Sequence, residues 1–322
     1  MATPMDPIIS AAFSMHATKG AYALLLGSGV SSGAAVLTGW GITENLIRRV
    51  AGLEKHDCEP NPWAWYESNY GVEADYSRLL KILGPTPADR KQILRSYFEP
   101  TPEEAERKEK VPGPAHRAIA QMVKSGHVKV ILTTNFDRLT EQAIRDEGVV
   151  PTVVSTEDAM HGALPLAHST CTLFKLNGDY DDIRIRNTQK ELDKYPKKIN
   201  VLLDEVLDRY GLVVCGWSAD YDGALRAALE RCRSRRFSTF WAHRGKLKGK
   251  AVGLLAQRGA ISVEIQDADH FFNRLSENLL SLEEADRTHP TDIRTTVSTV
   301  KRYLAEERHR IRLVDLACHP SQ

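Results

Sequence analysis

Short apolar runs alternate along this chain with amphipathic segments, and this alternation constrains the fold more than any other feature. The first run, AYALLL at 21–26, is apolar throughout and stops at a glycine, which is typical of a strand buried on both faces of a parallel sheet. In 199–210 the apolar residues instead recur three and four positions apart, which predicts a helix with one buried face. Repeated from residue 20 to about 282, the alternation predicts an α/β fold with a doubly wound parallel sheet.

The expected strands and helices follow this pattern along the chain. Further strands are expected at 127–134, 151–155, 171–176, 212–216, 237–242 and 260–265. Helices are expected at 42–52, 88–98, 135–148, 187–195, 199–211, 222–232, 248–259 and 268–282.

Residues 53–115 break the alternation. They hold eight prolines and a charge run, EEAERKEK, and no run that resembles a strand. We interpret this segment as a helical insertion within a domain that covers residues 1–282. The segment 283–322 contains VSTVKRYLAEERHRIRLVDLA and is expected to form a helical tail.

Composition excludes several classes of protein. The 43 basic and 42 acidic residues give a net charge of +1, which argues against non-specific nucleic-acid binding over the whole surface. No apolar stretch approaches the length of about 20 residues that a membrane-spanning helix needs, and the N-terminus lacks the features of a signal peptide. The five cysteines are scattered without a CxxC pair, which predicts reduced thiols, a cytoplasmic location and no zinc site.

Polar and glycine-rich clusters stand directly after four of the predicted strands, where ligands of such sheets bind. The first cluster, GSGVSSG at 27–33, has the glycines and free N–H groups that suit a phosphate, although an ordinary tight turn explains it too. Asn135 and Asp137 follow the second of these strands. Asn135 alone is equally well explained as a helix cap, but four clusters at four strand ends are less easily explained as caps.

The remaining clusters complete the candidate site. Small residues in GWSADYD at 216–222 would keep a channel open, and Ser218 or Asp222 would bond a ribose or cap a helix. The candidate dinucleotide-binding residues are Gly27, Ser28, Gly29, Val30, Ser31, Thr134, Asn135, Asp179, Gly216, Trp217, Ser218 and Asp222. The acids Asp267 and Asp269 stand where the adenosine end would lie, with helix capping as the alternative for Asp269.

The order of these clusters resembles the sirtuin (Sir2) family of NAD-dependent enzymes over residues 20–275. GSGVSSG resembles its phosphate loop, TTNFD its Thr-x-Asn-x-Asp segment, KLNGDY its Lys-x-His-Gly segment and GWSADYD its Gly-x-Ser segment. Paired zinc cysteines and the Pro-Asp-Phe-Arg of the deacetylases are absent from this sequence. The chain therefore looks more like the bacterial SIR2-like group than like the protein deacetylases.

This resemblance implies a Rossmann-like sirtuin fold and a function. Members of the SIR2-like group commonly act in antiphage defence and hydrolyse NAD to nicotinamide and ADP-ribose without a metal. They are often oligomers and often work with a partner, such as a sensor or a helicase-type ATPase. The resemblance places Asn135 beside the nicotinamide ribose, with Asp137 orienting it or stabilising developing charge.

Asn177 raises a difficulty, because it stands where the family has its histidine base. An amide cannot accept the proton that a histidine takes near neutral pH. Three explanations stay open: an engineered inactive variant, another group such as Asp179 or His168 acting as base, or NAD binding without turnover. His116 and His168 are otherwise interpreted as structural. The alternative function is thus a catalytically silent subunit that binds NAD or ADP-ribose.

Overall fold

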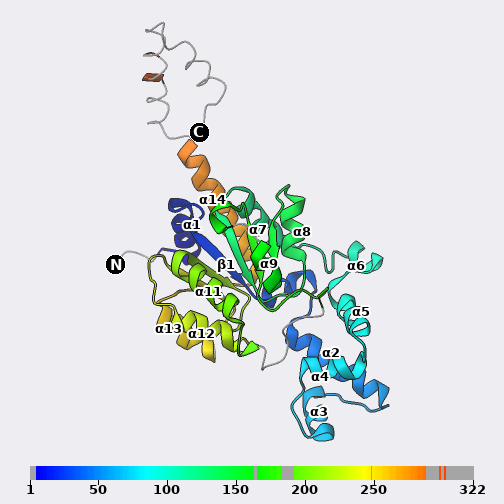
Figure 1. Ribbon diagram of the computed structural model, residues 1–322. Helices are drawn as coiled ribbons and strands as arrows, with labels where there is room; N and C mark the ends of the chain where they lie inside the picture. The colour runs from blue at the N-terminus through cyan, green and yellow to red at the C-terminus, as the bar shows by residue number, and fades with distance from the viewer. Residues whose placement is uncertain are drawn as a thin grey trace. The chain divides into compact units, whose positions relative to one another are not determined.

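The computed structural model describes residues 5–162, 165–182, 192–247, 249–287, 297–298 and 301. Its centre is one sheet of parallel strands in the order β3-β4-β2-β1-β5-β6-β7 (Figure 1). The doubly wound parallel sheet expected from the alternation is confirmed. The strands are β1 (Tyr22–Leu26), β2 (Val128–Thr133), β3 (Thr152–Val154), β4 (Thr172–Lys175), β5 (Gly211–Cys215), β6 (Thr239–His243) and β7 (Ile261–Glu264).

The register of the central strands brings their ends to one level. Leu26 at the end of β1 lies opposite Thr133 of β2 and Cys215 of β5, and Thr133 lies opposite Lys175 of β4. The segments that follow these four strands therefore start side by side at one edge of the sheet. The chain builds outward from β1 and β5 in opposite directions, so the switch point of the topology, where such sheets bind ligands, is between these two strands.

Helices cover both faces of the sheet. On one face, α11 (Lys197–Arg209), α12 (Gly223–Arg231) and α13 (Lys250–Arg258) share an apolar core with alternate residues of the strands (Figure 1). On the other, α1 (Pro7–Ala17) contacts β7, and α7 (Pro114–Lys124) contacts β2 and α8 (Leu139–Asp146). Helix α9 (Glu157–Gly162) contacts β3, and α14 (Ala268–Arg287) follows β7.

The predicted insertion consists of short helices, most of which begin with proline. They are α3 (Pro62–Tyr70), α4 (Tyr76–Leu83), α5 (Pro87–Phe98) and α6 (Pro102–Glu106), after α2 (Gly39–Leu53). Three of the four start with Pro because its missing N–H and fixed φ suit the first helical position, and capping boxes at Thr86 and Thr101 reinforce two of them. The insertion has its own apolar cluster, which includes Leu139 and Tyr180 of the main body.

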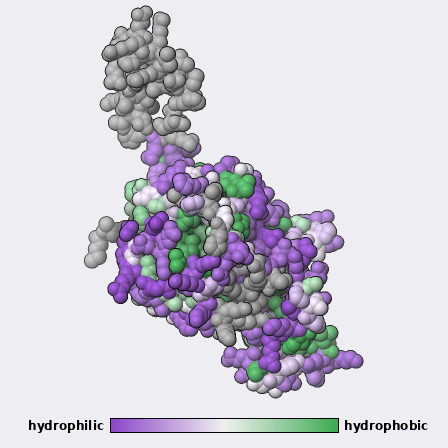
Figure 2. Space-filling view, viewed as in Figure 1, coloured by the Kyte–Doolittle hydropathy of each residue, from purple (hydrophilic) through white to green (hydrophobic). Residues whose placement is uncertain are grey.

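One expected boundary differs from the structure, and three other expectations lie partly outside the described residues or stay untested. Helix α8 begins at Leu139 rather than at 135, because Asn135 to Asp137 form a loop. The expected helix 187–195 falls largely outside the described residues, and so does most of the tail 283–322. The chain divides into two compact units, Met1–Ser276 and Glu277–Gln322, so the domain boundary expected at 282 stays a prediction. On the face shown in Figure 2 the first unit is mainly hydrophilic.

Candidate functional site

Two loops pack backbone against backbone at the switch point. The N–H of Gly27 donates to Cys215 O at 3.0 Å, and the N–H of Gly29 donates to Gly216 O at 3.0 Å. A Cβ on Gly27 would lie 2.3 Å from Gly216 O, and one on Gly29 would lie 2.8 Å from Gly216 Cα. Both glycines are therefore required by contact between the loops, whatever ligand binds there.

The same loop still presents free donors. It continues as two short 3-10 turns, η1 (Ser28–Val30) and η2 (Ser32–Ala34), before α2 begins at Gly39. Among the described residues, the N–H groups of Ser28, Ser32 and Gly33 donate no hydrogen bond. A glycine-rich turn with unpaired N–H groups suits a phosphate.

Asn135 has one polar atom without a partner. Its side chain does not cap α8; instead its Nδ2 approaches Ser31 Oγ at 3.4 Å. Its Oδ1 is buried and accepts no hydrogen bond within the described part of the chain. Leaving a buried acceptor unpaired costs about 1–3 kcal/mol, so this oxygen is available to a ligand hydroxyl or a water.

Ser31 joins Asn135 to a carboxylate and an imidazole. Its hydroxyl donates to Asp137 Oδ2 at 2.9 Å and lies 3.2 Å from His116 Nε2. The N–H of Gly113 donates to His116 Nδ1 at 3.2 Å, which leaves the proton on Nε2, where it donates to Ser31. Burial lowers the pKa of His116 below its ordinary value, although the Asp137 and Asp269 carboxylates oppose this shift. The imidazole is thus neutral. The hydrogen bonds run in one direction, from Gly113 to His116, from His116 to Ser31 and from Ser31 to Asp137.

His116 was interpreted from the sequence as structural, and the structure places it within the site. The one available signal was its position in PGPAHRAIA, where a histidine interrupts the buried face of an amphipathic helix.

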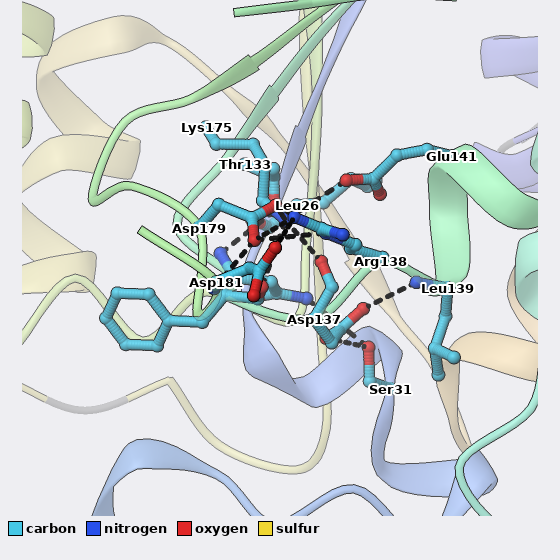
Figure 3. A network of polar contacts seen from close by, with 12 residues as sticks. Leu26, Ser31, Thr133, Asp137, Arg138, Leu139, Glu141, Lys175, Asp179 and Asp181 are labelled. Atoms are coloured by element: carbon cyan, nitrogen blue, oxygen red, sulfur yellow. Dashed lines mark hydrogen bonds and ion pairs between the residues drawn. The ribbon is translucent and has the colours of Figure 1, made fainter. Parts of the chain in front are cut away.

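A buried ion cluster holds the loop in place (Figure 3). Lys175 Nζ donates to the backbone oxygens of Phe136 and Asp137 at 3.0 and 2.6 Å. It also pairs with Glu141 at 3.0 Å and with Asp179 at 2.8 Å. Lys175 thus holds the turn that carries Asn135 and Asp137. Its position as a charged residue inside the apolar run CTLFKL indicates such a buried role from the sequence.

Asp179 is occupied by these charges. Besides Lys175, it accepts from Arg138 Nε at 3.0 Å. Burial raises its pKa, but Lys175 and Arg138 outweigh this effect and hold the pKa below the usual value. A carboxylate paired with two cations is a poor proton acceptor, so Asp179 serves the cluster. His168, the other suggested base, lies exposed at the end of η3 (Leu166–His168).

Both polar atoms of the Asn177 side chain have hydrogen-bond partners. Its Nδ2 donates to Asp222 Oδ1 at 2.9 Å and lies 3.5 Å from Thr134 O. Its Oδ1 accepts from the Tyr195 hydroxyl at 2.9 Å. Asp222 also accepts from Trp217 Nε1 at 2.7 Å. Asn177 therefore joins the ends of β2, β4 and β5, and it has no free acceptor comparable to that of Asn135.

The remaining predicted residues have local roles. Val30 is buried, and Ser218 Oγ accepts from the Asp220 N–H at 3.3 Å. Asp267 caps its own helix through the His270 N–H, while Asp269 Oδ1 accepts the Ala115 N–H of α7 at 2.8 Å. The capping alternative given for Asp269 is favoured by this geometry, although the N–H that it accepts belongs to the first turn of α7 and not to its own helix.

A polar cleft of about 590 Å³ lies on the outer side of the ion cluster. Its lining residues are Lys91, Arg138, Glu141, Arg145, Val153, Ser155, Asp179, Asp181 and Asp182. Within it Lys91 pairs with Asp181 at 2.6 Å and Arg138 with Asp179 at 2.9 Å. Asn135 does not line this cleft, so we keep it separate from the candidate site.

The described ranges contain no group of three His, Cys, Asp or Glu side chains arranged to hold a metal ion. Over the same ranges, no helix combines the length and the apolar character needed to cross a membrane. Cys58, Cys171, Cys215 and Cys232 are buried free thiols.

Residues 129–251 match the family model of the SIR2-like domain. This segment runs from β2 to the start of α13 and includes Asn135, Asp137, Asn177 and Asp222. The resemblance inferred from the sequence is confirmed for this part of the chain. The search of curated proteins found no match.

Several solved structures are similar to the chain. A Sir2 homologue in complex with NAD is 14% identical and covers 87% of this chain and 96% of its own, with a TM-score of 0.48. Sir2Af2 bound to a myristoylated histone peptide is 15% identical, with coverage of 86% and 98% and a TM-score of 0.41. A mutant Sir2 homologue with ADP-ribose is 12% identical, with coverage of 85% and 97% and a TM-score of 0.45. These similarities are remote, with no identity above 15% and no TM-score above 0.48.

Proposed function

We propose that this chain binds NAD and hydrolyses it to nicotinamide and ADP-ribose. The observation that carries the proposal is the unpaired Oδ1 of Asn135, buried beside the switch point of a parallel sheet. A ribose hydroxyl or the attacking water is the donor that this acceptor lacks. The match of residues 129–251 to the SIR2-like domain supports the same ligand.

Different residues would bind different parts of the dinucleotide. The free N–H groups of Ser28, Ser32 and Gly33 would bind the pyrophosphate, and Asn135 would hold the nicotinamide ribose and a water. In the reaction the water oxygen bonds to the ribose carbon, the bond to nicotinamide breaks with its electrons going to the ring nitrogen, and one proton is released. Positive charge builds on the ribose. The carboxylates of Asp137 and Asp222, which accept hydrogen bonds from neutral donors, would stabilise this charge.

A second candidate function follows from Asn177. An amide in the position of the base favours a subunit that binds NAD or ADP-ribose without turning it over. Incubation of the purified protein with NAD, with nicotinamide measured by chromatography, separates the two candidates. Release of nicotinamide supports the hydrolase; binding of ADP-ribose without release supports the silent subunit.

The decisive variant is Asn135→Ala. It removes the unpaired oxygen and is expected to lower kcat by about 100-fold or more, the range for loss of one key transition-state contact. Asn69→Ala, an exposed asparagine on α3, is the matched control and should behave as the wild type. Equal activity of the two variants would contradict the assignment of Asn135.

The biological setting is part of the proposal. On the resemblance to the SIR2-like group, we place the protein in bacterial antiphage defence, as a cytoplasmic homo-oligomer that acts with a sensor or a helicase-type ATPase. Cultures that express the wild type should survive phage challenge while their infected cells lose NAD, and cultures with Asn135→Ala should show neither effect. Light scattering of the purified protein tests the oligomer, and a single-chain mass would contradict it.

A further inference from the structure

Asp222 is a buried carboxylate at the start of a helix that it does not cap. It occupies the N-cap position of α12, yet its side chain makes no capping hydrogen bond. The residue is only 7% exposed. A carboxylate is expensive to bury, so a residue that is buried without capping its helix needs another reason to be there.

The partners of Asp222 are both neutral. Trp217 Nε1 donates to Oδ2 at 2.7 Å and Asn177 Nδ2 donates to Oδ1 at 2.9 Å. No cation pairs with Asp222 among the described residues, in contrast to Asp179 with its lysine and arginine. Each carboxylate oxygen accepts two hydrogen bonds, so each of these oxygens keeps one acceptor position.

Asn177 fixes the direction of this carboxylate. The Tyr195 hydroxyl donates to Asn177 Oδ1, which sets the amide so that its Nδ2 faces Asp222. The same Nδ2 lies 3.5 Å from the backbone oxygen of Thr134, the residue before Asn135. The carboxylate is thereby held one side chain away from the loop that carries Asn135.

We propose that Asp222 replaces the missing basic side chain and accepts the proton of the water that attacks NAD, with Asn177 holding it in place. This inference rests on the proposed hydrolysis. The water oxygen bonds to the ribose carbon, its proton passes to Asp222, and the bonding electrons leave with nicotinamide, so no other reactant is needed. The carboxylate also faces the positive charge that develops on the ribose. The asparagine at the base position is then one part of a two-residue substitute.

The test compares Asp222→Asn with Asp220→Asn. Asp220 is an exposed carboxylate two residues away in the same loop, and its variant should retain wild-type activity. Asp222→Asn should lower kcat by about 100-fold, within the usual range for a general base, while KM for NAD and the affinity for ADP-ribose change little. A change in KM alone, or a kcat within about threefold of the wild type, would overturn the proposal.

Azide provides a second measurement that a purely structural role would not affect. Azide attacks the ribose carbon without losing a proton, so it should restore nicotinamide release by Asp222→Ala and yield ADP-ribosyl azide. Azide should not restore the activity of Asn135→Ala, because that variant lacks the ribose contact. Failure of azide to restore folded Asp222→Ala would contradict the base role.

The two proposals fail differently. A wild type that hydrolyses NAD while Asp222→Asn keeps full activity overturns the role of Asp222 alone, and loss confined to Asp137→Asn would move that role to Asp137. A wild type that binds NAD without releasing nicotinamide overturns both the hydrolysis and the role of Asp222.

Discussion

At the scale of residues, two asparagines at neighbouring strand ends have opposite surroundings. Asn135 keeps a buried oxygen without a partner, while Asn177 uses its oxygen for Tyr195 and its nitrogen for Asp222. The sequence pattern alone treats them as equivalent polar residues after buried strands. Only the hydrogen-bond partners show that Asn135 keeps an unpaired acceptor, whereas Asn177 bonds to Tyr195 and Asp222.

The buried imidazole of His116 predicts a pH dependence of stability. Its pKa in the folded protein is lowered, mainly by burial, so the unfolded chain binds a proton more readily. The contribution of His116 to the free energy of unfolding is therefore complete above the ordinary pKa of about 6.5. It is lost as the pH falls below that value.

Chemical denaturation between pH 8 and pH 5 tests this prediction. His116→Gln has no titrating ring but can accept from Gly113 and donate to Ser31, so its stability should fall less on acidification than that of the wild type. The same change in the free energy of unfolding with pH for both proteins would contradict the prediction. The loss due to Asp179, whose pKa is also lowered, begins only near pH 4, the ordinary range of a carboxyl group.

At the scale of elements, the glycines of the β1 and β5 loops serve the contact between those loops. Gly216 has a φ of +73°, and a Cβ there would lie 2.6 Å from the Val30 nitrogen. The glycine pattern was interpreted from the sequence as a phosphate loop. The structure adds a packing reason, and the support for a phosphate comes from the unpaired N–H groups instead.

Gly216→Ala is therefore expected to destabilise the protein by at least about 2 kcal/mol, from backbone strain and overlap with the loop. Gly253→Ala is the matched control. It lies within α13 with open space around a new Cβ, and it should raise stability by about 0.5–1 kcal/mol. Thermal unfolding of both variants measures the difference, and similar melting temperatures would refute the packing argument.

At the scale of the whole molecule, Lys175 ties together segments far apart in the sequence. It joins β4 to the 136–137 turn and to Glu141 of α8 (Figure 3). Burial raises the pKa of Glu141, and Lys175 opposes this shift. The cluster makes the position of Asn135 depend on contacts across the sheet.

Lys175→Met should destabilise the fold by about 3–5 kcal/mol, because it leaves buried carboxylates without their cation. Adding Glu141→Gln should recover part of this loss, since the second variant removes one of those charges. Urea denaturation of the two single variants and the double variant gives the coupling energy. Strict additivity would show that the pair does not interact.

The fold and the position of the site were predictable to different degrees. All seven strands of the sheet were predicted. In β1, β4 and β5 every residue is buried, which leaves a continuous apolar run, whereas the edge strands β3 and β7 are only partly buried. Helix α1 was not predicted, and α8 was predicted to start at Asn135 although it starts at Leu139. Asp137 caps that helix through the Leu139 N–H, which leaves Asn135 in the loop.

The sequence by itself determined the parallel sheet, the loops at its carboxyl edge and the candidate residues there, since strand periodicity and the residues after each strand are local properties. The tertiary structure decided which of these residues are free to act. Ser31 meets His116 and Asp137, Lys175 occupies Asp179, and Asn177 meets Asp222. These pairs are separated by tens of residues in most cases, and only the packing of strands at one level brings their polar atoms within hydrogen-bonding distance.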